Sequence, residues 1–205
     1  AMIIGTAGFT AMLCVQALAD QHITPERGEI LVTGASGGVG SVAITLLNKL
    51  GYRVAAVTGR PEQNGDLLRS LGATRIIERA ELAQPAKPLE STRWAGAVDT
   101  VGSQILAKVL AQTEYDGAVA ACGLAGGMDL PTTVMPFILR NVKLIGVDSV
   151  YCPYEKRVAA WQKVAELLPE SYYAAASNEI ALEAVPEAAA QIIRGEITGR
   201  TLVKL

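Results

Sequence analysis

The chain has 205 residues, half of them hydrophobic and 19% charged, which supplies a large core and excludes a disordered protein. The formal net charge is −2 without a block of lysine or arginine, which argues against nucleic-acid binding. The three cysteines and the single histidine form no metal-ligand spacing, so we expect reduced thiols, no metal site and a cytoplasmic protein.

Residues 1–19 carry no charge and are long enough to cross a membrane. Glycine, threonine and glutamine dilute this stretch, however, and no basic segment precedes it as in a signal peptide. We therefore expect a buried helix in a protein that does not bind membranes. Since soluble proteins rarely begin in a buried helix, we also expect the protein to extend upstream of Ala1.

Strands and helices alternate along most of the chain. Apolar runs predict six strands, at residues 30–33, 53–58, 75–77, 97–101, 118–122 and 142–147. Helical spacing of apolar residues predicts helices at 39–50, 67–71, 105–110 and 155–168, with a loop at 80–93. This alternation favours parallel βαβ units, and the apolar strands favour a sheet covered on both faces. We therefore predict that residues 1–175 form an α/β Rossmann domain with a doubly wound parallel six-stranded sheet.

Residues 176–205 follow a different pattern. A strand is predicted at 179–181, a helix at 186–193 and a terminal strand at 201–204. We expect this segment to leave the Rossmann sheet.

A glycine cluster at residues 34–40 lies between the first predicted strand and the helix that follows it. Such a loop lets the backbone approach a pyrophosphate, and the helix offers free N–H groups and the positive end of its dipole. Gly38 would permit the close approach, and Gly40 would let helix and strand pack tightly. A glycine motif alone is weak evidence, but this context predicts dinucleotide binding. An ordinary turn of a flavodoxin-like domain is the alternative.

Thr58, Gly59 and Arg60 end the second predicted strand, about 20 residues after the glycines. Sites for NAD place a carboxylate here, which accepts a hydrogen bond from the ribose 2′-hydroxyl. A carboxylate would repel a 2′-phosphate, whereas a hydroxyl and a guanidinium bind it. The sequence therefore predicts NADPH, unless Arg60 is a solvated surface charge.

Two further residues lie at predicted strand ends. Asp99 either caps the next helix or lines the cofactor crevice, and the sequence does not decide between these roles. Cys122 has no histidine nearby in sequence to activate it as a nucleophile. We expect Cys122 to be a small wall residue near the nicotinamide.

The spacing of Gly34, Gly38 and Gly40 also fits the short-chain dehydrogenases, which share a Tyr-x-x-x-Lys pair. None of the six tyrosines has a lysine four residues later, which argues against that family. The form of residues 35–40 instead resembles the quinone oxidoreductase branch of the medium-chain dehydrogenase/reductase superfamily. Longer blocks are similar to its acrylyl-CoA reductase (NADPH) group, at residues 94–102, 120–127, 130–142, 146–150 and 199–204.

This resemblance, which covers essentially the whole chain, implies a set of cofactor contacts. NADPH would lie along the glycine loop at Ser36, Gly37, Gly38, Val39 and Gly40. The 2′-phosphate would be held by Thr58, Gly59 and Arg60, with Arg79 as a second positive contact. The ribose and nicotinamide region would be lined by Leu124, Ile138 and Ser149, near Cys122. A further family contact often uses asparagine where this chain has Gly195.

The resemblance also implies a GroES-like catalytic domain upstream, to which residues 176–205 would return, and a zinc-independent reaction. In the intact enzyme NADPH would reduce the C=C bond of acrylyl-CoA or a related enoyl thioester, while this fragment would be inactive alone. An NADPH:quinone reductase, a non-catalytic NADPH-sensing module and a purely structural partner domain are the alternatives. The family's usual layout further implies a possible homodimer through the sixth strand, at 142–150.

Overall fold

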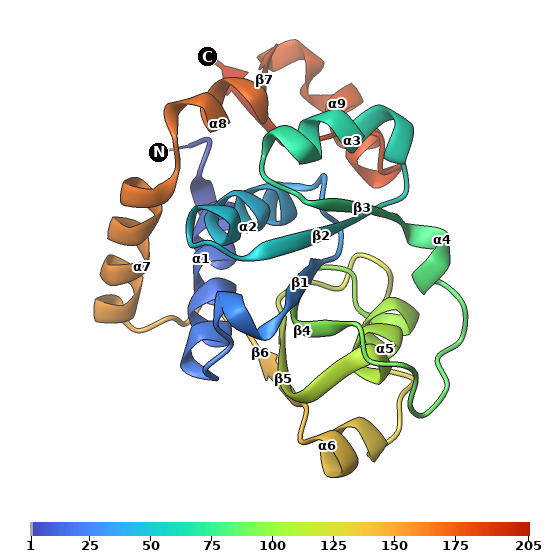
Figure 1. Cartoon of the computed structure of the whole chain (residues 1–205). Helices are drawn as coiled ribbons and strands as arrows, with labels where there is room; N and C mark the ends of the chain where they lie inside the picture. Colours follow the sequence, from blue (N-terminus) through green and yellow to red (C-terminus); the bar gives the residue numbers. More distant parts are fainter. Residues whose placement is uncertain (1) are drawn as a thin grey trace.

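The computed structural model of the chain describes residues 2–205 and contains one parallel six-stranded sheet (Figure 1). Its strands are β1 (Glu29–Val32), β2 (Arg53–Thr58), β3 (Arg75–Glu78), β4 (Trp94–Asp99), β5 (Thr113–Ala121) and β6 (Lys143–Gly146). They pair in the order β3-β2-β1-β4-β5-β6, and every pairing is parallel. This order confirms the predicted Rossmann fold, in which the order of the strands reverses between β1 and β4.

Helices cover both faces of this sheet. One face carries α1 (Gly5–Asp20), α2 (Gly38–Lys49), α3 (Pro61–Ser70) and α7 (Tyr154–Leu167), and the other carries α4 (Arg79–Leu82), α5 (Ser103–Gln112) and α6 (Met135–Arg140). Within β1, Ile30 and Val32 pack into the first layer and Leu31 packs into the second. Because successive side chains of a strand point to opposite faces, an unbroken apolar strand requires exactly this two-sided cover.

The predicted buried helix at the start of the chain is confirmed as α1, although Ala1 lies outside the described residues. Among residues 2–205, no helix combines the length and the apolar content that crossing a bilayer needs.

Several predicted boundaries were wrong. The segment 80–93 begins with the short helix α4, α3 starts at Pro61 rather than near 67, and β5 starts at Thr113 rather than 118. The edge strand β6 is shorter than the predicted 142–147. Helix α6 was not predicted, and its Pro136 lies in the first turn, where a helix needs no N–H donor.

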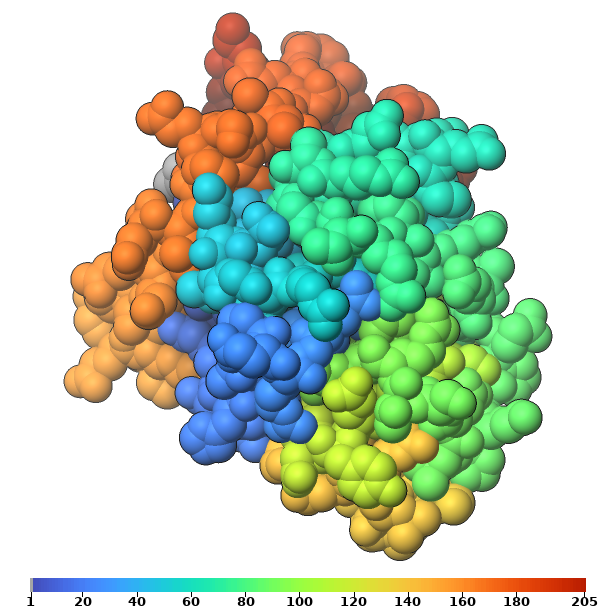
Figure 2. Space-filling view, viewed as in Figure 1, coloured from blue at the N-terminus to red at the C-terminus, as the bar shows by residue number. Residues whose placement is uncertain are grey.

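The C-terminal segment leaves the main sheet, as predicted. It follows α8 (Glu170–Ala175) and contains β7 (Ser177–Ala181), the short 3₁₀ helix at Leu182–Ala184, α9 (Val185–Ile193) and β8 (Arg200–Lys204). Strands β7 and β8 form a separate parallel pair. Figure 2 shows the orange residues around α8 lying against the cyan and teal surface of α2 and α3. Here the Tyr172 hydroxyl lies 3.0 Å from the hydroxyl of Ser41 in α2.

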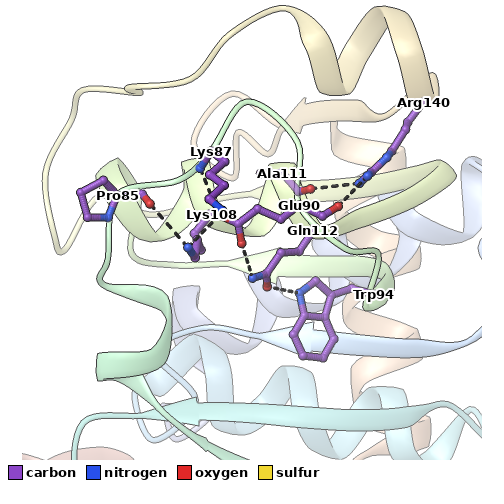
Figure 3. Close-up of polar contacts among 8 residues, drawn as sticks. All are labelled: Pro85, Lys87, Glu90, Trp94, Lys108, Ala111, Gln112 and Arg140. Atoms are coloured by element: carbon purple, nitrogen blue, oxygen red, sulfur yellow. Dashed lines mark hydrogen bonds and ion pairs between the residues drawn. The ribbon is translucent and has the colours of Figure 1, made fainter.

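A half-buried polar network fixes the connection between α4 and β4 (Figure 3). Glu90 accepts hydrogen bonds from Lys108, at 2.7 Å, and from Gln112, at 2.8 Å, while the buried indole of Trp94 donates to Gln112 at 3.2 Å. Burial opposes ionisation of Glu90, but the hydrogen bonds from Lys108 and Gln112 outweigh it and lower the pKa of Glu90. Arg140 donates to backbone carbonyls of the same region, so α6 is tied to this network.

Gly40 allows α2 to pack directly on the loop before it. An added Cβ would lie 2.8 Å from the Ala35 Cα and would also collide with the Gly34 carbonyl oxygen. Because backbone must then move, we expect Gly40→Ala to lower the free energy of unfolding by about 1–3 kcal/mol in urea denaturation. Gly146→Ala is the matched control, since nothing lies within 4 Å of its added Cβ. Equal stability of the two variants would contradict this packing role.

Candidate cofactor site

A cavity of about 450 Å³ opens at the carboxyl ends of β1, β2 and β4. Ligands of doubly wound folds bind at this edge, at the point where the strand order reverses. The cavity is lined by Gly34, Ser36, Gly37, Val57, Thr58, Gly59, Arg60, Arg79, Thr100, Val101, Ile105, Ala125, Gly126, Arg194, Gly195 and Ile197. The glycine loop, the end of β2 and the C-terminal segment therefore share one cavity.

The glycine loop supplies an uncapped helix end to this region. Gly37 is the residue before α2, no side chain caps it, and the first turn of α2 contains no acidic residue. The N–H groups of that turn are therefore available to an anion. Gly34 adopts a left-handed backbone with φ of +58°, and its missing side chain leaves room for the Thr100 hydroxyl.

Asp99 caps the turn before α5 instead of lining the cavity. Its carboxylate accepts a hydrogen bond from the Thr33 hydroxyl at 2.7 Å and another from the Gly102 N–H at 2.8 Å. Burial raises the pKa of Asp99, and these two hydrogen bonds oppose that effect. The Thr33 hydroxyl in turn accepts from the Thr100 N–H at 3.0 Å. This network, which the sequence did not reveal, joins the ends of β1 and β4.

The charge of the cavity is positive. Three arginines line it, Arg60, Arg79 and Arg194, and among the residues that the structure describes no aspartate or glutamate does. Arg194 is paired with Glu187 at 3.1 Å and with Glu196 at 2.8 Å, so its charge is partly balanced outside the cavity. The remaining two guanidinium groups give the cavity its electrostatic preference for an anion.

The Arg79 guanidinium packs against the backbone of Gly59, the residue that follows β2. A Cβ added to Gly59 would be 3.1 Å from the Arg79 guanidinium carbon. The glycine therefore admits the guanidinium to the end of β2, where a dinucleotide-binding fold places the adenosine ribose.

Arg60 connects the end of β2 to the C-terminal segment. Its guanidinium donates to the Glu196 carbonyl at 2.6 Å, the Ile197 carbonyl at 3.1 Å and the Thr198 hydroxyl at 3.2 Å. The Thr198 hydroxyl donates to Asn64 at 3.0 Å. These contacts show that Arg60 is not a free surface charge, and they hold the segment 196–198 in place, of which Ile197 lines the cavity.

A second cavity, of about 780 Å³, lies on the α1 side of the glycine loop. Its lining includes three of the predicted nicotinamide-end or loop residues, namely Val39, Cys122 and Ser149. Thr6 and Trp161 also line it. Leu124 and Ile138 line neither cavity, and their side chains are 64% and 71% exposed. Gly38 and Gly40 also line neither cavity, since they belong to the first turn of α2. The other predicted site residues divide between the two cavities and an exposed apolar surface.

Cys122 contacts a second thiol. Its hydrogen bond with Cys14 lowers the pKa of Cys122, while burial and Asp99 oppose this. The Cys122 thiol also lies 3.5 Å from the Asp99 carbonyl, to which it donates. The residues that line its cavity include no histidine, so the structure offers no base that would make Cys122 a nucleophile.

Sequence reasoning missed several residues of these cavities as site contacts, among them Thr100, Ile197 and Arg200. Ile197 and Arg200 come from the C-terminal segment, more than 130 positions after the glycine loop. No local motif marks them as contacts, because they reach the site through the tertiary fold. The turn at Arg194 and Gly195, where the family resemblance implies a further contact, lines the first cavity.

A family model described as zinc-binding dehydrogenase matches residues 38–169. Among the described residues, no group of three or more histidine, cysteine, aspartate or glutamate side chains could hold a metal ion.

Curated relatives resemble the whole chain. It is 62% identical over 205 residues to the probable acrylyl-CoA reductase AcuI of Escherichia coli (strain K12), covering 100% of this chain and 63% of that protein. It is 54% identical to the acrylyl-CoA reductase AcuI of Ruegeria pomeroyi, covering 99% of this chain and 62% of that protein. The chain thus spans a little under two thirds of the length of these relatives.

Solved structures agree with this relationship. The yhdH oxidoreductase of Salmonella enterica in complex with NADP superposes with a TM-score of 0.96 at 62% identity, covering 100% of this chain and 62% of that one. The yhfP protein of Bacillus subtilis with NAD bound gives 0.92 at 45% identity, with the same coverage. The chain therefore belongs to the zinc-binding dehydrogenase family, within the medium-chain dehydrogenase/reductase superfamily, and its similarity to the acrylyl-CoA reductases is confirmed.

Proposed function

We propose that this chain is the NADPH-binding part of a reductase that acts on acrylyl-CoA or a related enoyl thioester. The observation that carries the proposal is the cavity at the end of β2, which contains three arginines and, among the described residues, no carboxylate. The NADP bound in the Salmonella enterica relative supports the same cofactor.

The 2′-phosphate of NADPH would bind to the guanidinium of Arg79 and to the N–H groups of Arg60 that remain free. A guanidinium has five N–H donors, and the contacts of Arg60 with the C-terminal segment leave some of them free. Phosphate suits such planar groups because two parallel hydrogen bonds can form. The bare diol of NADH would gain neither bond, and the cavity offers it no carboxylate acceptor in the described chain.

The rest of the cofactor would extend from Ser36 and Gly37 to the second cavity, beside Val39, Cys122 and Ser149. When bound, NADPH supplies a hydride for the β-carbon of an enoyl thioester. Cys122 and Val39 would exclude water from the nicotinamide end, and Ser149 would orient it by hydrogen bonding. Leu124 and Ile138, which are both exposed, would contact the nicotinamide end of the bound cofactor and be covered by it.

The proton that completes the reduction would come from outside this chain. Among the described residues, neither cavity is lined by a histidine, tyrosine, aspartate or glutamate. We assign the proton to solvent or to a catalytic domain, and we expect this chain to be inactive alone.

The boundary after residue 175 also belongs to this proposal. Residues 1–175 would be the cofactor domain, and 176–205 would return to a GroES-like catalytic domain, as the separate β7–β8 pair suggests. A homodimer through β6 is supported by its place at the edge of the sheet, since an edge strand has unpaired backbone groups.

A quinone reductase that uses NADPH is the second candidate. It is favoured by a 46% identical relative from Bacillus subtilis, which is named a putative quinone oxidoreductase, YhfP. The fold and the glycine loop serve both reactions equally, because they hold the cofactor and not the substrate.

Arg79→Ala tests the phosphate preference. Losing charge-assisted hydrogen bonds of about 1.5–3 kcal/mol should weaken NADPH binding roughly 10- to 100-fold in isothermal titration calorimetry, with NADH affinity unchanged. Arg69→Ala is the matched control, because Arg69 is an exposed arginine paired with Asp66 outside the cavity. Parallel loss of NADPH and NADH affinity, or no change in either, would speak against Arg79 as a phosphate ligand.

The substrate proposal needs the full-length protein that contains this chain. We expect it to oxidise NADPH with acrylyl-CoA at a kcat/KM at least tenfold above that with a simple benzoquinone, because a conjugated thioester accepts hydride at its β-carbon. Saturated propionyl-CoA, which has no C=C bond, is the blank. The reverse preference would select the quinone reductase, and NADPH binding without turnover of either substrate would select a sensing module.

A further inference from the structure

A buried asparagine in α3 joins the end of β2 to the C-terminal segment. Asn64 is 3% exposed and lines neither of the two cavities. Its side-chain nitrogen Nδ2 donates to the Thr58 hydroxyl at 3.4 Å, and its Oδ1 accepts from the Thr198 hydroxyl at 3.0 Å. The amide of Asn64 is therefore held between two threonines from distant parts of the chain.

These two bonds belong to a longer chain of hydrogen bonds that begins at the Arg60 guanidinium. A guanidinium can only donate, and the Thr198 hydroxyl accepts from it at 3.2 Å. The Thr198 hydroxyl gives its own proton to Asn64, and Asn64 in turn donates to Thr58. All donors of this chain therefore point the same way, from Arg60 toward the Thr58 hydroxyl.

The Thr58 hydroxyl can act toward a ligand only as a donor. Its oxygen accepts from Asn64 and also from the Arg60 backbone N–H at 3.2 Å. A hydroxyl has two acceptor lone pairs and one proton, so both lone pairs of this oxygen are in use. Within the described chain the proton itself goes to no acceptor, and Thr58 lines the cavity at the end of β2. That proton is therefore available to a group bound in the cavity.

A fixed donor at this place favours a phosphate over a diol. Phosphate oxygens accept hydrogen bonds, and their charge makes those bonds stronger than bonds to a neutral hydroxyl. The ribose hydroxyls of NADH are neutral, and they cannot donate to an oxygen whose lone pairs are already occupied. Because the chain starts at a cation, each bond also polarises the next one and strengthens the last donor.

We propose that Asn64 is a positioning residue that determines cofactor preference, because it fixes the Thr58 hydroxyl as a donor toward the 2′-phosphate. This inference rests on the proposed NADPH function. Thr198 holds the other side of the Asn64 amide, so the C-terminal segment contributes to the same preference. Neither Asn64 nor Thr198 lines the cavity, and both would act on the cofactor only through Thr58.

The test uses calorimetry on the full-length protein that contains this chain. Asn64→Leu removes both hydrogen bonds at a similar volume, and it should weaken NADPH and adenosine 2′-monophosphate binding about fivefold without changing NADH affinity. Asn64→Asp keeps the shape but offers only acceptors, so the Thr58 hydroxyl would turn toward it and NADPH binding should fall roughly tenfold or more. Thr113→Val is the matched control, since this buried threonine donates to the Val109 carbonyl and lines neither cavity.

A double variant tests whether Asn64 acts through Thr58. Thr58→Val removes the last donor of the chain and should lower NADPH affinity by itself. Adding Asn64→Leu to Thr58→Val should then cause no further loss of NADPH preference, because the hydrogen-bond chain no longer reaches the ligand. Residues that act as one network show this non-additivity, whereas independent sites add.

Each outcome decides between the proposals. A wild-type ratio of NADPH to NADH affinity in Asn64→Leu would overturn the role of Asn64 and leave the proposed function standing. Equal losses for NADPH and NADH, or additive losses in the double variant, would show a role in the fold alone and would also overturn it. If Asn64→Leu does not fold in a thermal unfolding scan, Thr198→Val, which breaks the chain one step earlier, takes its place and should lower the NADPH preference in the same way. A wild-type protein without a preference for NADPH would overturn the proposed cofactor itself.

Discussion

A buried hydrogen-bond network between the ends of β1 and β4 holds the chain where the sheet reverses its order. The Thr33 hydroxyl donates to Asp99 and accepts from Thr100, and the Thr100 hydroxyl donates back to the Thr33 carbonyl at 2.9 Å. Since the two strands are neighbours that lead to opposite faces of the sheet, their ends would otherwise diverge freely. The glycine loop starts directly after Thr33, so this network fixes the point at which the loop leaves β1.

The C-terminal segment closes the site from the far end of the chain. It touches the end of β2 through Arg60, the glycine loop through Ser36, and the start of α1 through Arg200. A binding surface built from segments so distant in sequence depends on folding of the whole chain, unlike a site contained in one βαβ unit. Within this segment, β7 and β8 form a parallel pair of their own, separate from the main sheet.

The charged side chains at this edge of the sheet share one sign. The arginines that face the first cavity are all positive, although the chain as a whole carries a formal charge of −2. Arg194 is balanced by Glu187 and Glu196, whereas Arg60 and Arg79 form no ion pair in the described chain, which favours phosphate groups at this edge of the sheet. The polar network around Glu90 shows the contrasting arrangement, since Lys108 is neutralised by a carboxylate there.

The sequence by itself determined the class of fold and the location of the dinucleotide loop. Both depend on local patterns: apolar strands alternating with helices, and glycines between the first strand and its helix. The end of β2 was also recognisable, because Thr58, Gly59 and Arg60 are contiguous. These features are encoded within a few residues of where they act, so they can be recognised without knowing which distant segments meet.

The tertiary structure alone decided which role Asp99 takes, where Arg60 points, and that Arg200 lies at the glycine loop. The partners of Arg60 are chiefly backbone carbonyls at residues 196 and 197, and every residue type has such a carbonyl, so no side-chain pattern marks them. Arg200 lies 162 positions after Gly38, and neither residue alone indicates the other. Contacts of this kind arise from how folded segments pack, which composition and local spacing do not record.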